Sequence, residues 1–357
     1  MSRSTSVRRA GTTAVAISVA VSLAAVASPA QAAPADRGAH WLSDQLTNGI
    51  VVGHGTFGDY NDYGLSIDTA FALRAIGGHR TEVRQVRHAM SHHVGDYIGA
   101  GSEHYAGPTA KLLVLAETTG GDPTSFGGVN LIRKLNRQVT KSGGAKGRIA
   151  DTSKYGDYAN TVGQILAVRG LTAAKSGQAV PARRFLLKQQ CRQGYFRLNF
   201  SKVTATHQGC RRTSPADPDT TAYAVIQLWK TSRGKARFRG ALKDAVTWLA
   251  RQQRRNGSYV GGTSTATPNT NSTGLAAWAL GLTGHCSAAR AAATWVAGLQ
   301  VGAEPAGSKL AGERGAIAYD RRSLKAGRHD GIVDATQDQW RRATSQAAPG
   351  LLFRHGC

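Results

Sequence analysis

The sequence predicts an all-α protein in which six helical hairpins close into a double ring, an α6/α6 toroid. Three observations predict this fold. Similar pairs of helices recur along the chain, the first helix of a pair ends in a Gln-x-x-x-Gly-x-aromatic turn, and the second begins with Asn, Ser or Thr and is rich in Ala and Gly. One such hairpin cannot bury its own apolar faces, whereas closure into a ring leaves no hairpin with an unburied side.

The clearest pair of helices lies between Trp248 and Leu280. Trp248 and Leu249 belong to the apolar face of an amphipathic helix that ends in a Gln-x-x-x-Gly-x-Tyr turn at residues 253–259. Residues 269–273 are Asn, Ser and Thr, which cap helices, and Ala and Gly dominate the helix that follows. Small side chains let the second helices approach closely where the circumference of a ring is smallest.

Further copies of this pair follow one another along residues 33–357. Residues 190–196 repeat the turn, and residues 217–228 repeat the second helix. Each second helix is expected to open at a threonine. These threonines are Thr69, Thr109, Thr161, Thr221, Thr273 and Thr344. Their number predicts six hairpins.

The Gln-x-x-x-Gly-x-aromatic turns resemble degenerate QW-type repeats of the terpene-cyclase and protein-prenyltransferase superfamily of α/α toroids. That superfamily also includes vitamin B12 carriers of the transcobalamin type. The resemblance covers nearly all of residues 33–357 and depends on several weak motifs in order. It implies the toroid fold, but it does not select one activity.

The N-terminal segment has the pattern of a secretory signal peptide. Arg3, Arg8 and Arg9 precede an apolar run, and Ala30-Gln31-Ala32 matches a cleavage site. We therefore expect a signal peptide at residues 1–32 and a single toroid domain at residues 33–357. No later apolar run is long enough to span a bilayer, so we expect an extracellular protein without a membrane span, associated with the cell wall or free of it.

Cleavage would leave a strongly basic chain. The signal peptide holds three of the 45 Lys and Arg residues and none of the 21 acidic ones, so 42 basic residues would remain and the formal net charge would be +21. Such a surface attracts polyanions, among which anionic cell-wall polymers are the expected partners, unless the charge serves solubility alone. The basic residues are scattered and lack interleaved aromatic residues, which argues against nucleic-acid binding. A monomer is expected.

Four cysteines in an exported chain favour two disulfides, for which three connectivities exist. Cys191 and Cys210 flank the irregular segment after one Gln-x-x-x-Gly turn, where a disulfide would hold the loop in place. Cys286 and Cys357 would then form the second bond, which would fasten the C-terminus to the ring.

The sharpest candidate for catalysis is the segment Asp217-Pro218-Asp219-Thr220. It resembles the Asp-x-Asp-Asp-Thr-Ala motif of class II terpene cyclases, in which the middle aspartate protonates an alkene or epoxide, and Asp219 stands in the place of that acid. Thr220 departs from the motif, and such cyclases commonly place their site between two helical barrels, whereas this chain has length for one. The simpler interpretation is capping, with Asp217 as N-cap and Asp219 complementing the helix dipole.

A second group of candidates surrounds the rim where the second helices begin. Tyr, Asp, Asn, His and Thr side chains are expected there, around a concave mouth suited to a polar or sugar-like ligand. These ligand-binding candidates are Tyr60, Asp62, Asp68, His104, Tyr105, Tyr158, Asn160, Thr221, Asn271 and Thr273. The alternative is that they are helix caps with exposed tyrosines nearby.

No metal site or cofactor is expected. His88 and His92 share a helix face at a spacing that can chelate zinc, but no Glu accompanies them as in zinc proteases, and a solvated face is the simpler interpretation. The Asp-x-Cys pair of the prenyltransferase zinc site is missing from the sequence.

The function preferred from the sequence is that of a secreted ligand- or surface-binding protein without catalysis. Its pocket would lie at the rim, and its ligand would be a small molecule such as an isoprenoid or, by resemblance to transcobalamin, a corrinoid. The alternative is an enzyme, either a terpene-cyclase-like isomerase or a polysaccharide lyase or hydrolase, with Asp217 or Asp219 as the general acid.

Overall fold

The computed structural model describes Met1 and residues 33–262 and 265–357. The expected signal peptide, apart from Met1, therefore lies outside the described residues. Residues Ala33–Cys357 form one compact unit, and they are mostly helical, as the sequence predicts. No helix within the described residues is long and apolar enough to cross a membrane.

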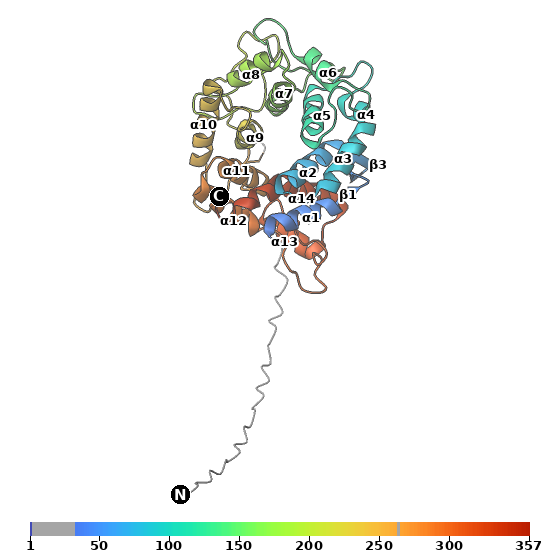
Figure 1. Ribbon diagram of the computed structural model, residues 1–357, viewed down its shortest axis with the longest axis vertical. Helices are drawn as coiled ribbons and strands as arrows, with labels where there is room; N and C mark the ends of the chain where they lie inside the picture. The colour runs from blue at the N-terminus through green and yellow to red at the C-terminus, as the bar shows by residue number, and fades with distance from the viewer. Residues whose placement is uncertain (2–32, 263–264) are drawn as a thin grey trace. The chain divides into compact units, whose positions relative to one another are not determined.

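Six helices form the inside of this unit and contact one another in chain order (Figure 1). They are α2 (Tyr63–Ile76), α5 (Ala106–Thr119), α7 (Thr161–Ala173), α9 (Pro218–Leu228), α11 (Thr270–Leu282) and α14 (Asp334–Ala347). Each contacts the next one, and α14 also contacts α2, so the series of contacts returns to its start. We call these six the inner helices.

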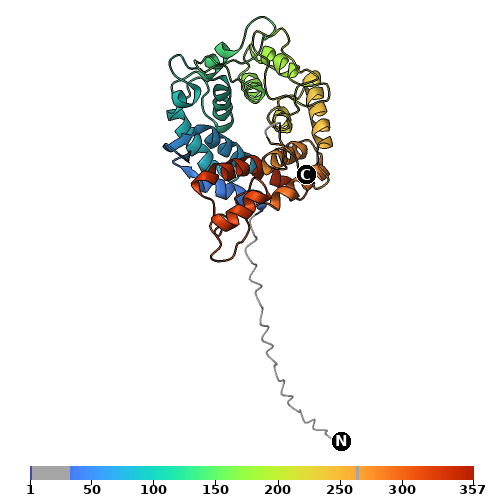
Figure 2. The ribbon, with the colours of Figure 1, turned by 180° about the vertical axis from the view of Figure 1, so that it is seen from behind.

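The remaining helices lie outside the inner ones, as both views show (Figures 1 and 2). They are α1 (Pro34–Asp44), α3 (Arg80–His92), α4 (Val94–Ile98), α6 (Leu131–Gln138), α8 (Ala179–Lys188), α10 (Ala236–Arg251), α12 (Cys286–Ala297), α13 (Arg321–Asp330) and a 3-10 helix, η1 (Ala348–Phe353). Helices α3, α6, α8, α10 and α12 pack against α2, α5, α7, α9 and α11 respectively, and α1 packs against α2 and α14.

The two classes of helix differ in the way the sequence predicts. On the outer helix α10, apolar residues such as Phe238, Leu242, Ala245 and Leu249 recur at helical spacing and are buried, while the opposite face is charged. The inner helix α11 is buried almost all round. A helix packed on every side needs small or apolar residues throughout, which explains its Ala, Gly and Leu content.

One element departs from the all-α prediction. A three-stranded antiparallel sheet of β1 (Leu46–Thr47), β2 (Ile50–Gly55) and β3 (Gly58–Asp62) leads into α2. Asn48 and Gly49, with positive φ angles of 52° and 85°, connect β1 to β2. An Asn-Gly pair before a β-branched run is the strongest local signal for a hairpin, so the sequence does contain the cause of this sheet.

The recurrent glutamine ties neighbouring hairpins together. Gln190 donates from its side-chain nitrogen to the carbonyl oxygens of Gly194 in its own turn (2.8 Å) and of Ala241 in the next outer helix (2.6 Å). The same two bonds join Gln253 to Gly257 and Ala288, and Gln300 to Gly315 and Pro34. Because Pro34 begins α1, the last of these bonds connects the C-terminal part of the chain to its first helix.

The recurrent threonine ties each turn to an inner helix. Thr273 accepts a hydrogen bond from the backbone of Tyr259 (3.0 Å), and Thr221 and Thr344 do the same for other turns. The prediction that each threonine opens its helix is wrong for Thr69, which lies in the middle of α2, and for Thr344, which lies in the last turn of α14. Helix α14 starts early because residues 334–343 contain no Gly or Pro to interrupt it.

The turn glycine is expected to be indispensable for stability. Gly257 has φ of +87°, and a Cβ there would overlap the carbonyl oxygen of Ala291 in α12. Gly257→Ala should therefore lower the free energy of unfolding by about 2–4 kcal/mol, of which backbone strain contributes about 1. Gly284 is the control, since its φ is +82° but no described atom lies within 4 Å of such a Cβ. Urea unfolding of both variants checks this, and equal losses would rule out the overlap.

Candidate functional site

A cavity of about 330 Å³ lies among the inner helices, and every one of the six contributes to its wall. We call it the lumen cavity. Its lining residues are Asp68, Lys111, Val162, Leu166, Leu198, Asp217, Asp219, Thr220, Tyr223, Gly262, Thr265, Leu275 and Gln346. Aliphatic side chains therefore share the wall with carboxyl groups and one amine.

The start of α9 supplies the two aspartates of the lumen cavity. Asp217 is the N-cap and accepts a hydrogen bond from the backbone of Thr220 (2.7 Å), as the capping interpretation expects. Pro218 takes the first helical position, which suits its fixed φ. Asp219 follows in the first turn and is not needed as a cap, so its carboxyl group is available for another role.

Asp219 is a half-buried acid. Its Oδ1 atom is inaccessible to solvent and has no hydrogen-bond partner among the described residues. The pKa of Asp219 is raised to about 7, and burial is the main cause; the Ser272 hydroxyl opposes the shift, and the nearby Asp217 carboxylate adds to it. The Ser272 oxygen makes no hydrogen bond of normal geometry within the described part of the chain. Near neutral pH the carboxyl group can therefore carry a proton to donate.

The raised pKa of Asp219 should make stability depend on pH. In the unfolded chain this carboxyl loses its proton near pH 4, whereas the folded chain keeps it until about pH 7, so the free energy of unfolding falls as pH rises between these values. The loss is about 2–4 kcal/mol. Asp219→Asn cannot ionise, so it should stabilise the protein relative to wild type more at pH 8 than at pH 4.5. Urea unfolding at both values checks this, and an equal difference at the two would contradict it.

An ion pair faces the aspartates across the lumen cavity. Lys111 of α5 lies 2.7 Å from Asp68 of α2, and its amine also donates to the carbonyl oxygen of Gly64 (2.9 Å). Lys111 and Tyr223 line this cavity but were not predicted from the sequence. A lysine in the otherwise apolar run of α5 was the signal that could have identified Lys111, because an unpaired charge is rarely placed on a buried helix.

A second cavity, of about 570 Å³, adjoins the first, since Leu198 and Asp217 line both. We call it the loop cavity. Its lining residues all come from the segment 197–217, and they include Arg197, Lys202 and Arg211 and several Ser and Thr side chains. It is therefore the more polar of the two, and Asp217 lies at their junction.

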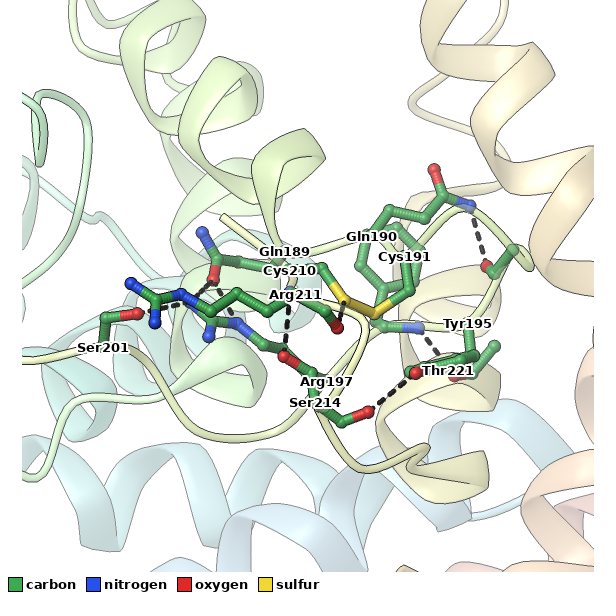
Figure 3. Close-up of a disulfide and its surroundings, with 12 residues drawn as sticks. Gln189, Gln190, Cys191, Tyr195, Arg197, Ser201, Cys210, Arg211, Ser214 and Thr221 are labelled. Atoms are coloured by element: carbon green, nitrogen blue, oxygen red, sulfur yellow. Dashed lines mark hydrogen bonds between the residues drawn. A yellow bond between two sulfur atoms is a disulfide. The ribbon is translucent and has the colours of Figure 1, made fainter. Parts of the chain in front are cut away.

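A disulfide holds the wall of the loop cavity in place (Figure 3). Cys191 is joined to Cys210, and Cys286 to Cys357, as the sequence predicts. Arg197 donates to the side-chain oxygen of Gln189 (3.0 and 2.8 Å), so the loop is also tied to the end of α8. Few regular backbone bonds exist in this segment, and these cross-links replace them.

The structure brings only some of the candidate residues together. Asp68, Asp217 and Asp219 line the lumen cavity. Others act within the fold: Asp62 and Asn160 are N-caps, and Thr221 and Thr273 hold turns. Outside the lumen cavity lie Tyr60 in β3, His104 in a bridge to Thr152, Tyr105 before α5, Tyr158 on the surface and Asn271 inside α11. No group of three or more metal-binding side chains occurs in the described ranges; the rings of His88 and His92 pack edge-to-face, with 4.7 Å between their centroids.

Comparison with known proteins identifies the fold. No protein-family model matches the chain, and no curated protein matches it. Among solved structures, a protein from Actinoplanes is similar at 18% identity with a TM-score of 0.59, over 90% of this chain and 98% of that chain. This chain has the α/α-toroid fold. Two toroid enzymes with known activities show the same likeness.

The first of these enzymes is the type II terpene cyclase MstE from Scytonema, at 16% identity and a TM-score of 0.58, over 89% of this chain and 98% of that one. The second is an unsaturated glucuronyl hydrolase from Bacillus sp. GL1, which is responsible for the degradation of glycosaminoglycan. Its sequence identity is 13% and its TM-score 0.57, over 90% of this chain and 96% of that one. The predicted resemblance in fold to toroid enzymes is confirmed by these two structures, whereas neither of them is a carrier of the transcobalamin type. At these identities the likeness concerns the fold alone.

Proposed function

We propose that the protein is an enzyme and that Asp219 is its general acid, acting at the lumen cavity. The observation that carries this proposal is a buried carboxyl oxygen without a partner among the described residues, in the wall of a cavity. A raised pKa from burial, next to a second carboxyl group, is the usual arrangement of a catalytic acid. This reverses the preference for non-catalytic binding, which has no comparable support.

The substrate class that fits best is an acidic carbohydrate. The lumen cavity and the loop cavity meet at Asp217, so one extended substrate could occupy both and place a bond beside Asp219. Lys202 and Arg211 suit carboxylate or sulfate groups, and the Ser and Thr hydroxyls suit sugar hydroxyls. The Bacillus hydrolase is responsible for the degradation of glycosaminoglycan, which is consistent with this class.

The proposed reaction is acid-assisted hydrolysis of a glycosidic bond. Asp219 gives its proton to the leaving oxygen as the carbon–oxygen bond breaks, and water adds to the sugar carbon. Asp68, held by Lys111, is the other carboxyl group on the opposite side and would accept the proton from that water. The leaving oxygen then carries one proton, and Asp219 regains its own from solvent.

A second candidate is a terpene-cyclase-like isomerase. Val162, Leu166, Leu198 and Leu275 provide an apolar wall near Asp219, and the Asp217–Thr220 segment resembles the cyclase motif. The objection that one barrel is too short no longer holds, because this chain spans 98% of the MstE chain. MstE binds geranylgeranyl dihydroxybenzoate, so a prenylated aromatic is the matching substrate. The ion pair of Asp68 and Lys111 within the cavity favours the carbohydrate.

The proposal also covers the export of the protein and the organisation of its domain. Residues 1–32 are proposed to be a signal peptide for export, and residues 33–357 one domain of six hairpins in a closed double ring. The cyclic contacts of the inner helices and the bond from Gln300 to Pro34 support closure. Monomeric state stays a prediction.

The experiment that tests the proposed function is product analysis. Residues 33–357 would be incubated at pH 6 with uronate oligosaccharides, with matched neutral oligosaccharides and with geranylgeranyl dihydroxybenzoate, and mass spectrometry would follow the products. We expect cleavage of the acidic oligosaccharides, with a mass gain of one water per bond. Isomerisation of the prenylated aromatic alone would favour the second candidate. Binding of any of them without conversion would return the assignment to a non-catalytic protein.

A further inference from the structure

The positive charge of the protein is concentrated in one arc of the ring. Residues 131–216, from the start of α6 to the residue before the N-cap of α9, contain 17 Lys and Arg residues and two acidic residues, a formal net charge of +15. Residues 33–130 contain six basic and ten acidic residues, a net charge of −4. We call residues 131–216 the basic arc; it comprises α6, α7, α8 and the loops around them (Figure 1). The basic residues are therefore unevenly distributed around the ring, in contrast to the scatter expected above.

Both acidic residues of the basic arc are engaged within the fold. Asp157 forms an ion pair with the buried Arg148 (2.6 Å). Asp151 accepts hydrogen bonds from the backbone of Ala106 (2.6 Å) and of Tyr158 (3.1 Å). Twelve cations of the arc are exposed, namely Arg133, Arg137, Lys141, Lys146, Lys154, Lys175, Arg184, Lys188, Arg192, Lys202, Arg211 and Arg212. The field outside this part of the ring is therefore strongly positive.

Three loops of the basic arc are tied together, and one of them lines the loop cavity. Arg148 follows the loop of residues 141–147; it pairs with Asp157 of the second loop and donates to the carbonyl oxygen of Ser201 in the third (3.1 Å). Lys188 donates to the carbonyl oxygen of Gly144 (3.0 Å). A chain that leaves the loop cavity can therefore continue over the neighbouring loops. Exposed cations that line neither the loop cavity nor the lumen cavity lie on all three loops: Lys146, Lys154 and Arg212.

The exposed cations do not lie on one flat face. Lys154 precedes α7 and Lys175 follows it, so the two lie near opposite ends of a helix of 13 residues, which is about 20 Å long. Arg184 lies on the outer helix α8. A bilayer surface would meet only one of these sides, whereas a flexible polymer can pass from one to the next. The distribution of charge therefore favours a polymer over a membrane.

Two exposed tyrosines in the basic arc suit a sugar ring. Tyr155 and Tyr158 are 66% and 75% exposed, and Nζ of Lys154 lies 5.0 Å from the ring centroid of Tyr155. An aromatic face can pack against the apolar face of a sugar, while the neighbouring amine meets its acidic group. Single-stranded nucleic acids need a succession of stacking rings, and no other Phe, Tyr or Trp of this arc, which is described throughout, is exposed.

We propose that the basic arc is a binding surface for a long anionic polysaccharide, which it holds outside the loop cavity. The choice of a polysaccharide rests on the function proposed above, because the loop cavity lies within the arc and would receive the same chain as substrate. The arc would concentrate the polymer at the site by contacts with many of its charges. The enzyme would accordingly act on polymers in preference to short fragments.

The test is calorimetric titration of residues 33–357 carrying Asp219→Asn, which prevents turnover, with chondroitin sulfate polymer in 100 mM salt. Adding Lys146→Gln/Lys154→Gln/Arg212→Gln should weaken binding about tenfold or more and reduce its salt dependence, because three ionic contacts are lost. Arg321→Gln/Arg322→Gln/Lys325→Gln is the matched control: it removes the same charge from exposed residues of α13, on the other side of the ring (Figure 1), and we expect a change of less than twofold. The chondroitin sulfate tetrasaccharide should bind at least tenfold more weakly than the polymer.

Equal losses in the two triple variants would overturn the proposal, as would a polymer affinity no higher than that of the tetrasaccharide. DNA that binds as tightly as the polymer, and loses affinity in the same triple variant, would assign the basic arc to nucleic acid instead. These titrations measure binding alone, so they separate the two proposals. Retention of the expected losses without any cleavage in product analysis would remove only the enzyme function, whereas cleavage with equal losses in both triple variants would remove only the binding surface.

Discussion

Asp219→Asn is expected to lower turnover by two to four orders of magnitude, the usual contribution of a general acid. The amide has nearly the same size and still fits the lumen cavity, but it has no acidic proton to give. We expect KM to change little, because Asp219 acts on the leaving oxygen in the transition state rather than on the bound substrate. Steady-state kinetics on the substrate found by product analysis would measure both constants.

Asp217→Asn is the matched control for this variant. Asparagine is as good an N-cap as aspartate, so the bond from the backbone of Thr220 should persist and the fold should be unchanged. Asp217 raises the pKa of Asp219, so its neutralisation should shift the loss of activity at high pH to a lower pH while turnover at pH 5 stays within tenfold of wild type. If Asp217→Asn lost more turnover than Asp219→Asn, Asp217 rather than Asp219 would be the general acid.

Removal of the Cys191–Cys210 disulfide is expected to affect both stability and function. A double replacement by serine releases a loop with a sequence separation of 19, which should lower the free energy of unfolding by about 3 kcal/mol. Because this loop forms the wall of the loop cavity, we also expect weaker substrate binding, seen as a higher KM. Thermal unfolding and kinetics under non-reducing conditions measure the two effects.

Removal of the Cys286–Cys357 disulfide is the control that separates the effect on stability from the effect on substrate binding. Serine at Cys286 and Cys357 releases a longer loop, with a sequence separation of 71, and should lower stability by about 4 kcal/mol. Neither residue lines the lumen cavity or the loop cavity, so KM should stay unchanged while the protein remains folded. A similar rise of KM in both double variants would show that the loop cavity has no special role in binding.

The fold could be predicted from the sequence because the same contacts recur in each hairpin and require the same residues at the same spacing. The glutamine and glycine of each turn are required by contacts with the next outer helix, so they recur visibly in Gln190, Gln253 and Gln300. The Cys191–Cys210 disulfide could be predicted because the two cysteines flank the loop after a turn, and the Cys286–Cys357 disulfide then followed by exclusion. The sheet before α2 was not predicted, although Asn48-Gly49 is a local signal for its first turn, because helical repeats dominate the rest of the sequence.

The site was less predictable, because side chains that meet in a ring come from distant segments. The Asp217–Asp219 segment stood out as a motif, and Asp68 was found by its place near an inner-helix start. The pairing of Lys111 with Asp68 spans two hairpins, and no local pattern encodes such a contact. Most other rim candidates belong to helix caps and turns. Asn, Asp and Thr are equally suited to capping a helix and to binding a ligand, so the sequence alone does not distinguish the two roles.

The most direct measurement is the titration of Asp219 itself by carbon NMR. Protein with labelled aspartate carboxyl carbons would be followed from pH 4 to pH 9, with Asp219→Asn to assign the resonance. We expect one carboxyl resonance with a midpoint near pH 7 that is absent from the variant. If instead every aspartate titrates below pH 5, Asp219 is ionised at neutral pH and cannot be the general acid that we propose.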